Sequence, residues 1–126
     1  MIHRSVFGIL IGTALAVSQG VHAAGNVKKG ADAFAEECGD CHSLTEGKNK
    51  KGPSLHGVFG RQAGSLNGYG GYSEAMKQTG FVWTEEKVDA YITQPRKLVP
   101  GGKMKYDGLQ DASQRADIIA YLSSVK

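Results

Sequence analysis

The segment "ECGDCHSL" at residues 37–44 contains two cysteines three positions apart, followed at once by a histidine. Three chemistries use cysteine pairs at this spacing: thiol redox exchange, zinc binding and covalent haem attachment. A histidine directly after the second cysteine is typical of haem attachment, because two thiols can reach two vinyl groups while the imidazole is placed as an axial ligand. Cys38, Cys41 and His42 are therefore the candidate attachment site.

The other two chemistries fit the rest of the chain less well. A thioredoxin-like pair is expected near a βαβ pattern, which the sequence lacks. A structural zinc ion needs four ligands, and only His56 offers an obvious fourth. A purely structural disulfide between such close neighbours closes a very short loop and stabilises little. The motif therefore favours haem.

The first residues have the layout of a secretory signal peptide, with Arg4 near the start, an apolar run over residues 6–17 and small residues around Ala23. The run is shorter than the roughly 20 residues of a bilayer-spanning helix. We predict cleavage after Ala23, with Ala24 as the alternative. Residues 1–23 would then be a cleaved signal peptide, and export would place residues 24–126 in the periplasm.

Residues 24–126 have the size of one small domain, whose core alone would be marginally stable without a disulfide, metal or cofactor. The whole chain has a formal net charge of only +3. No basic run is interleaved with aromatic residues, so the sequence does not indicate binding to nucleic acid.

Hydrophobic periodicity predicts an all-α domain with four helices. The first helix has an apolar stripe that ends at the first cysteine: Val27, Ala31, Phe34, Ala35 and Cys38. Next come a short helix that Ser73 caps and Gly80 closes, and a longer helix that begins after Thr84 and stops before Pro95.

A final helix starts near Asp111 or Ser113, either of which is a suitable cap. Its apolar face consists of Ile118, Tyr121, Leu122 and Val125. Residues 45–71 and 96–109 lack periodicity and are rich in glycine, so we predict loops. A small protein keeps that much irregular backbone when it wraps around another object. The expected fold is thus about four to five short helices and long loops around one covalently bound haem.

A haem with His42 on one face can take a second protein ligand on the other. The candidates outside the leader are His56, Met76 and Met104. His56 is too close in sequence to His42 to cross easily to the opposite face, and a hydrogen-bonded loop histidine is the simpler interpretation. Met76 lies in a predicted helix and fits a packing role. Met104, in a loop far along the chain, is favoured.

Residues 25–125 resemble the class I cytochromes c, a family that includes the mitochondrial protein and small periplasmic carriers. The matching stretches stand in the family's order and spacing: "CGDCH", "KGPSLHGVFGRQAG", "GYSEAMKQTG", "WTEEKVDAYITQP", "PGGKMKYDGL" and "RADIIAYL". The resemblance implies a soluble one-electron carrier, not an enzyme. Its single haem would cycle between Fe(III) and Fe(II) to shuttle electrons between respiratory or photosynthetic complexes.

The resemblance also implies roles for particular residues. Cys38 and Cys41 would form the thioethers, and His42 and Met104 the axial bonds. The haem surroundings would include Pro53 at the His42 ring, Arg61, Tyr72 and Trp83 at a propionate, and Tyr91 beside the methionine sulfur. The first and last helices would pack closely through Gly30, Phe34 and Tyr121.

Several positions depart from the family pattern. The site departures are Gly102 in place of a hydroxyl residue that bonds a propionate, an extra residue at Gly70 and Gly71, and Tyr106 where phenylalanine is frequent. Two further departures are Glu37 and Asp111, at positions that are often lysine. None of them removes a ligand.

The family's partners imply docking at the exposed haem edge of a monomer. A quinol-oxidising cytochrome bc complex is the expected donor, and an oxidase, reaction centre or reductase the expected acceptor. The matching basic rim consists of Lys50, Arg96, Lys97, Lys103 and Lys105.

Two other classes of protein remain as alternatives. A small haem peroxidase or gas-binding cytochrome would need an open distal site, with a weak or absent bond from Met104. A binding module stabilised by a disulfide or zinc would carry no haem. An absorption spectrum of the oxidised protein distinguishes the three.

Overall fold

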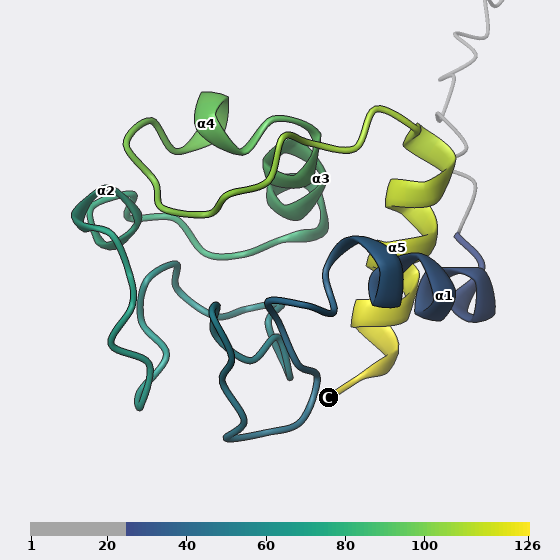
Figure 1. Cartoon of the computed structure of the whole chain (residues 1–126), viewed down its shortest axis with the longest axis horizontal. Coiled ribbons are helices and arrows are strands. Elements are labelled where there is room, and N and C mark those ends of the chain that lie inside the picture. Colours follow the sequence, from purple (N-terminus) through teal and green to yellow (C-terminus); the bar gives the residue numbers. More distant parts are fainter. Residues whose placement is uncertain (1–24) are drawn as a thin grey trace, which may run out of the picture.

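The computed structural model describes residues 25–126. The predicted signal peptide and its cleavage at Ala23 or Ala24 lie outside this range. The described residues form five helices, and their only β pairing is an isolated bridge between Gln62 and Val82. Long irregular segments connect the helices (Figure 1). This confirms the predicted all-α class. Within residues 25–126 no helix is long and apolar enough to cross a membrane.

Helix α1 spans Val27–Glu37, and Asn26 caps it by accepting a hydrogen bond from the Lys29 amide at 2.9 Å. The helix ends at Cys38, as predicted. The predicted apolar stripe is partly wrong, because Val27 is 47 % exposed and Ala35 is also exposed. The buried face consists instead of Gly30, Ala33 and Phe34. A glycine has no hydrophobic side chain, so periodicity could not identify it as the centre of the contact.

Helix α5 spans Ala112–Ser124 and packs across α1 (Figure 1). A Cβ atom on Gly30 would lie 2.0 Å from the Asp117 carbonyl oxygen, so only glycine permits this approach. The rings of Phe34 and Tyr121 meet edge to face, with their centroids 5.8 Å apart. The close packing that the family resemblance implied is therefore present. From α5, Ile118 is the most deeply buried core residue, at 1 % exposure.

Side-chain caps begin three further helices largely where the sequence indicated. Helix α2 spans Glu74–Lys77 after Ser73, α3 spans Glu85–Thr93 after Thr84, and α5 follows Asp111. Each of the three caps accepts hydrogen bonds from backbone amides of the first turn. The sequence left Asp111 and Ser113 open as caps of α5, and the structure uses Asp111.

Helix α4, Pro95–Leu98, was not predicted. Its first residue is the proline that the sequence analysis treated only as a stop signal for α3. Proline has no amide hydrogen to donate and a fixed φ, which suits the first position of a new helix. The segment therefore contains one more helical turn than expected.

The core combines residues of α1, α3 and α5 with residues of the irregular segments. Its buried members are Ala33, Phe34, Val58, Ala63, Trp83, Val88, Tyr91, Val99, Ile118 and Leu122.

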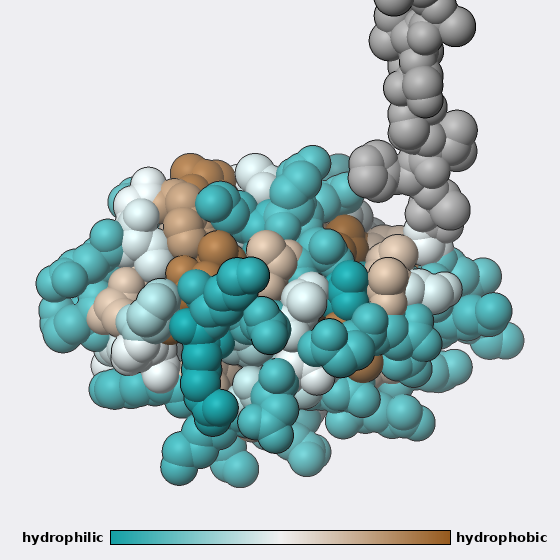
Figure 2. Space-filling model, turned by 90° about the horizontal axis from the view of Figure 1, so that it is seen from above, coloured by the Kyte–Doolittle hydropathy of each residue, from teal (hydrophilic) through white to brown (hydrophobic). Residues whose placement is uncertain are grey.

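Hydrophilic residues cover most of the face seen in Figure 2, and apolar residues occupy only small areas of it.

Candidate haem site

The cysteine and histidine motif forms a tight turn at the end of α1. The amides of Cys41 and His42 donate to the Cys38 carbonyl at 3.1 and 3.0 Å, and the Cys38 amide donates to Phe34 at 2.8 Å. Both cysteines are partly buried free thiols. One helix end thus presents two thiols and an imidazole together.

The ring of His42 is held in a fixed orientation. Its Nδ1 lies 2.8 Å from the carbonyl oxygen of Pro53, the contact that the family resemblance implied. Burial lowers the pKa of His42, although the hydrogen bond to Pro53 opposes this effect. A Cβ atom on Gly52 would lie 2.3 Å from Cε1 of the ring, so glycine is needed beside it. A neutral imidazole that donates from Nδ1 keeps Nε2 available as a metal ligand.

The environment of Cys38 disfavours the thiolate, which is the form that takes part in thiol redox exchange. Burial, with smaller contributions from Glu37 and Cys41, raises the pKa of Cys38 to about 12. Within residues 25–126 no group of three or more histidine, cysteine, aspartate or glutamate side chains is arranged to hold a metal ion. The fourth zinc ligand considered above, His56, is engaged elsewhere, with Nδ1 3.2 Å from the Leu44 carbonyl oxygen.

Met104 lies next to His42 and packs against the hydrophobic core. Two hydrogen bonds flank Met104 along the chain. On its N-terminal side the Gly102 amide donates to the Val99 carbonyl at 3.0 Å, and on its C-terminal side the Leu109 amide donates to the Ile92 carbonyl at 2.8 Å. A neutral imidazole, two unpaired thiols and a neighbouring thioether together fit a covalently attached haem.

Gly102 stands where a hydroxyl residue was expected from the family pattern. A Cβ atom there would lie 3.1 Å from the Val99 carbonyl oxygen, a tight contact. The close turn between Val99 and Gly102 therefore suits a residue without a side chain.

Arg61 and Trp83 lie on two paired segments. The Trp83 amide donates to the Arg61 carbonyl at 2.8 Å. The Arg61 guanidinium donates to the carbonyls of Ser54 and His56 at 2.9 and 2.7 Å. The Trp83 ring packs beside Tyr91, with their centroids 5.2 Å apart. Burial raises the pKa of Tyr91 to about 12, so its hydroxyl stays protonated near neutral pH.

Tyr72 is anchored in a tyrosine pair. Its hydroxyl accepts a hydrogen bond from the Leu66 amide at 3.3 Å, and its ring meets Tyr69 at a centroid distance of 4.8 Å. The extra residue of the glycine pair lies beside this contact, because a Cβ atom on Gly71 would lie 2.5 Å from the Tyr69 hydroxyl. The two tyrosines thus fix the loop that precedes α2.

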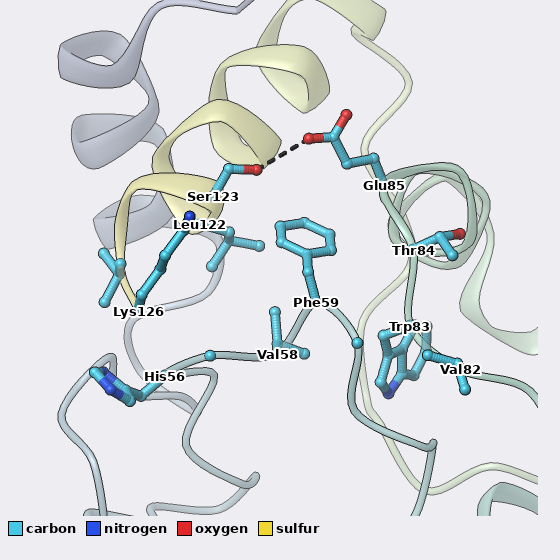
Figure 3. A pocket seen from close by; sticks show the side chains of 13 residues that line it. His56, Val58, Phe59, Val82, Trp83, Thr84, Glu85, Leu122, Ser123 and Lys126 are labelled. Carbon is cyan, nitrogen blue, oxygen red and sulfur yellow. Dashed lines mark hydrogen bonds between the residues drawn. The ribbon is translucent and has the colours of Figure 1, made fainter.

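The surface has a groove of about 660 Å³. It runs between residues 56–60, the start of α3 and the end of α5, where Ser123 donates to Glu85 at 3.0 Å (Figure 3). Neither cysteine of the motif, nor His42 or Met104, lines it. The groove therefore contains none of the attachment or ligand residues, although it shares Trp83 with the expected haem surroundings.

Three hydrogen bonds near the Met104 segment, made by the side chains of Arg115 and Tyr106, were not predicted from the sequence. Arg115 donates to an Asp89 carboxylate oxygen at 2.8 Å and to the Leu109 carbonyl at 2.8 Å. The hydroxyl of Tyr106 donates to Glu37 Oε2 at 2.6 Å. Burial first, and then this hydrogen bond, raise the pKa of Tyr106 well above its ordinary value. The hydrogen bonds to Asp89 and Glu37 have no local sequence signal, because their partners are 26 and 69 positions apart along the chain.

The helical fold and the donor set define a small protein that attaches haem through two cysteines. The profile of the cytochrome c family matches residues 27–126. Cytochrome c of Gibberella zeae is 46 % identical over 79 % of this chain and 94 % of its own length. Cytochrome c2 of Rhodopila globiformis is 48 % identical, covering 81 % and 95 %, and cytochrome c of Arabidopsis thaliana is 44 % identical, covering 78 % and 88 %.

The chain therefore belongs to the cytochrome c family. It is an electron carrier rather than an enzyme, and it carries a covalently bound haem c. When bound, the haem iron accepts and releases one electron at a time. Redox proteins are its partners.

Proposed function

We propose that this chain is a periplasmic carrier whose haem iron has His42 and Met104 as axial ligands. The observation that carries the assignment is the position of Met104 beside an imidazole whose Nδ1 is bonded to Pro53 at 2.8 Å. A His42 ring that donates from Nδ1 to the Pro53 carbonyl would keep Nε2 available to hold the iron. A methionine opposite it favours Fe(II) and raises the potential. With both axial positions filled by protein, electron transfer is the remaining chemistry.

The residues around this site have proposed roles in binding and shielding the haem. Cys38 and Cys41 provide the thioethers. Arg61 and Tyr72, together with Trp83, surround a propionate, where a buried charge needs polar partners. The guanidinium of Arg61 already donates to two loop carbonyls, so it contributes its positive charge from a fixed position. Tyr91 lies beside Trp83 and provides a protonated hydroxyl near the methionine.

The proposed location rests on the predicted signal peptide at residues 1–23. In the periplasm, the expected donor is a quinol-oxidising cytochrome bc complex. The expected acceptor is an oxidase, a photosynthetic reaction centre or a reductase. The similarity to a cytochrome c2 is compatible with a carrier of this kind.

An absorption spectrum tests the ligand assignment directly. The purified oxidised protein is expected to show a Soret band together with a weak near-infrared band from charge transfer between sulfur and iron. That band requires a methionine ligand. A high-spin spectrum without it would instead support an open distal site, and the absence of a Soret band would support a module without haem.

We also propose that redox partners dock on the basic rim around the exposed haem edge. Its five basic side chains are all exposed: Lys50, Arg96, Lys97, Lys103 and Lys105. Two of them have neighbours within the chain, because Lys50 donates to the Gly39 carbonyl at 2.7 Å and Arg96 lies 3.8 Å from Asp107. The lysines on either side of Met104 are therefore the best residues to test.

We expect Lys103→Glu/Lys105→Glu to slow electron transfer to an acidic partner roughly tenfold at low salt, because the basic rim steers the encounter. Raising the salt from about 0.01 to 0.15 M shortens the screening length from roughly 30 to 8 Å and should slow the original protein while narrowing the difference. Stopped-flow rates measure both effects. The matched control is Lys28→Glu/Lys29→Glu, the same charge change on exposed residues of α1. Equal rates in all three proteins would place docking on another face.

A further inference from the structure

The segment that carries Met104 has few hydrogen bonds to the rest of the protein. Its flanks are anchored, because Gly102 donates to Val99 and Leu109 donates to Ile92. Between these anchors, residues 103–108 make no backbone hydrogen bond to any other described residue. The position of the methionine therefore depends on side-chain contacts.

One of those contacts is a strong hydrogen bond. The Tyr106 hydroxyl donates to Glu37 Oε2 at 2.6 Å, the length of a hydrogen bond to a charged carboxylate. In the part of the chain that the structure describes, the other polar contact of this stretch joins Arg96 to Asp107 at 3.8 Å, with side chains 75 % and 97 % exposed. Such an exposed pair contributes little. Among the described residues, Tyr106 thus provides the main polar attachment of this stretch.

Glu37 and Tyr106 each lie close in sequence to a residue of the candidate haem site. Glu37 is the last residue of α1 and directly precedes Cys38, whereas Tyr106 lies two residues after Met104. The hydrogen bond therefore joins the end of the helix that presents the attachment cysteines to the loop that presents the methionine.

We propose that Glu37 and Tyr106 are a pair of positioning residues that keeps Met104 on the haem iron. The proposal deepens, and rests on, the ligation of the iron by Met104. When the hydrogen bond is intact, the methionine segment is held against the end of α1. Without it, the segment opens more often, and an added ligand can replace the methionine.

Tyr106→Phe in the haem-loaded protein tests this role, because it removes the hydroxyl and keeps the ring. Imidazole is added to the oxidised protein, and loss of the near-infrared band measures displacement of the methionine. Since imidazole binds only the open form, its apparent affinity reports how often that form is populated. We expect about tenfold tighter apparent binding, equivalent to about 1.4 kcal/mol. Without imidazole, the band should remain.

A second variant and a matched control make the result specific. Glu37→Gln removes the charge of the acceptor, and in the double variant its effect should not add to that of Tyr106→Phe. Tyr69→Phe is the control, because it removes a hydroxyl that donates to the Lys51 carbonyl at a similar distance, 2.7 Å, in another loop. Its imidazole affinity should equal that of the unchanged protein. Hydrogen exchange should accelerate at the Leu109 amide, which donates to Ile92 at the end of the segment, and stay unchanged in α5.

The outcomes separate this proposal from the ligation on which it rests. Suppose that Met104→Ala abolishes the near-infrared band but that Tyr106→Phe and the unchanged protein bind imidazole with equal affinity. The ligation by Met104 would then stand, and the positioning role of Tyr106 would be overturned. Equal tightening in Tyr69→Phe would show general loosening and also overturn it. If the unchanged protein lacked the band, both proposals would fail.

Discussion

Met104→Ala is expected to abolish the near-infrared band of the oxidised protein and to lower its reduction potential. Alanine cannot ligate iron, so the coordination position opposite His42 becomes accessible to added imidazole or cyanide. Because the thioether favours Fe(II), its loss should lower the potential by more than roughly 60 mV, the shift for a tenfold change in a one-electron couple. Absorption spectroscopy and a redox titration measure the two effects.

Another side chain of the protein can occupy the freed position in this variant. Lys103 is the first candidate, because it is exposed and adjacent in sequence. His56 is held by its hydrogen bond to Leu44 at 3.2 Å and must leave that contact first. We therefore expect Met104→Ala/Lys103→Ala to bind imidazole more tightly than Met104→Ala alone.

Met76→Ala is the matched control, since Met76 is also a partly buried methionine packed against the core. It should weaken packing but retain the near-infrared band. If the band survived in Met104→Ala and disappeared in Met76→Ala, the assignment of the ligand would be wrong.

The positions of helices could be predicted where the signal is local. Ser73, Thr84 and Asp111 begin helices because their side chains satisfy amides of the first turn, which depends on only a few neighbouring residues. The buried face of α1 was less predictable, because it is centred on Gly30, whose contact with Asp117 exists only in the packed structure. Pro95 shows a different limit, since the same residue can end one helix and begin the next.

In the candidate haem site, too, the residues that are neighbours in sequence could be predicted, and the contacts between distant residues could not. Cys38, Cys41 and His42 are neighbours in sequence, and their spacing alone predicts the attachment chemistry. The contact between Glu37 and Tyr106 joins residues 69 positions apart, and neither residue has a local pattern that identifies the other. Arg115 is similar, because its partner Asp89 on α3 becomes a neighbour only when α5 packs against α3.

The variant Cys38→Ala/Cys41→Ala is expected to lose most of its helical structure. The described helices are short, with 11, 9 and 13 residues in α1, α3 and α5 and four in each of the others. Isolated helices of this length are marginal in water, so they depend on tertiary packing. A covalently bound haem supplies much of the apolar surface against which such a small chain can pack. Far-UV circular dichroism should show helicity reduced by more than about half.

Two single variants show how the effect depends on attachment. Cys38→Ala and Cys41→Ala each keep one possible thioether as well as His42, so both should retain haem and a cooperative thermal transition at a lower midpoint. Ser43→Ala controls for substitution in the same turn, because Ser43 is buried and its hydroxyl donates to the Lys48 carbonyl, away from the two cysteines. A double variant with native-like helicity and cooperative melting would show that the polypeptide core folds without the haem. Its apolar contacts, centred on Ile118 and the packing of α1 against α5, would then suffice.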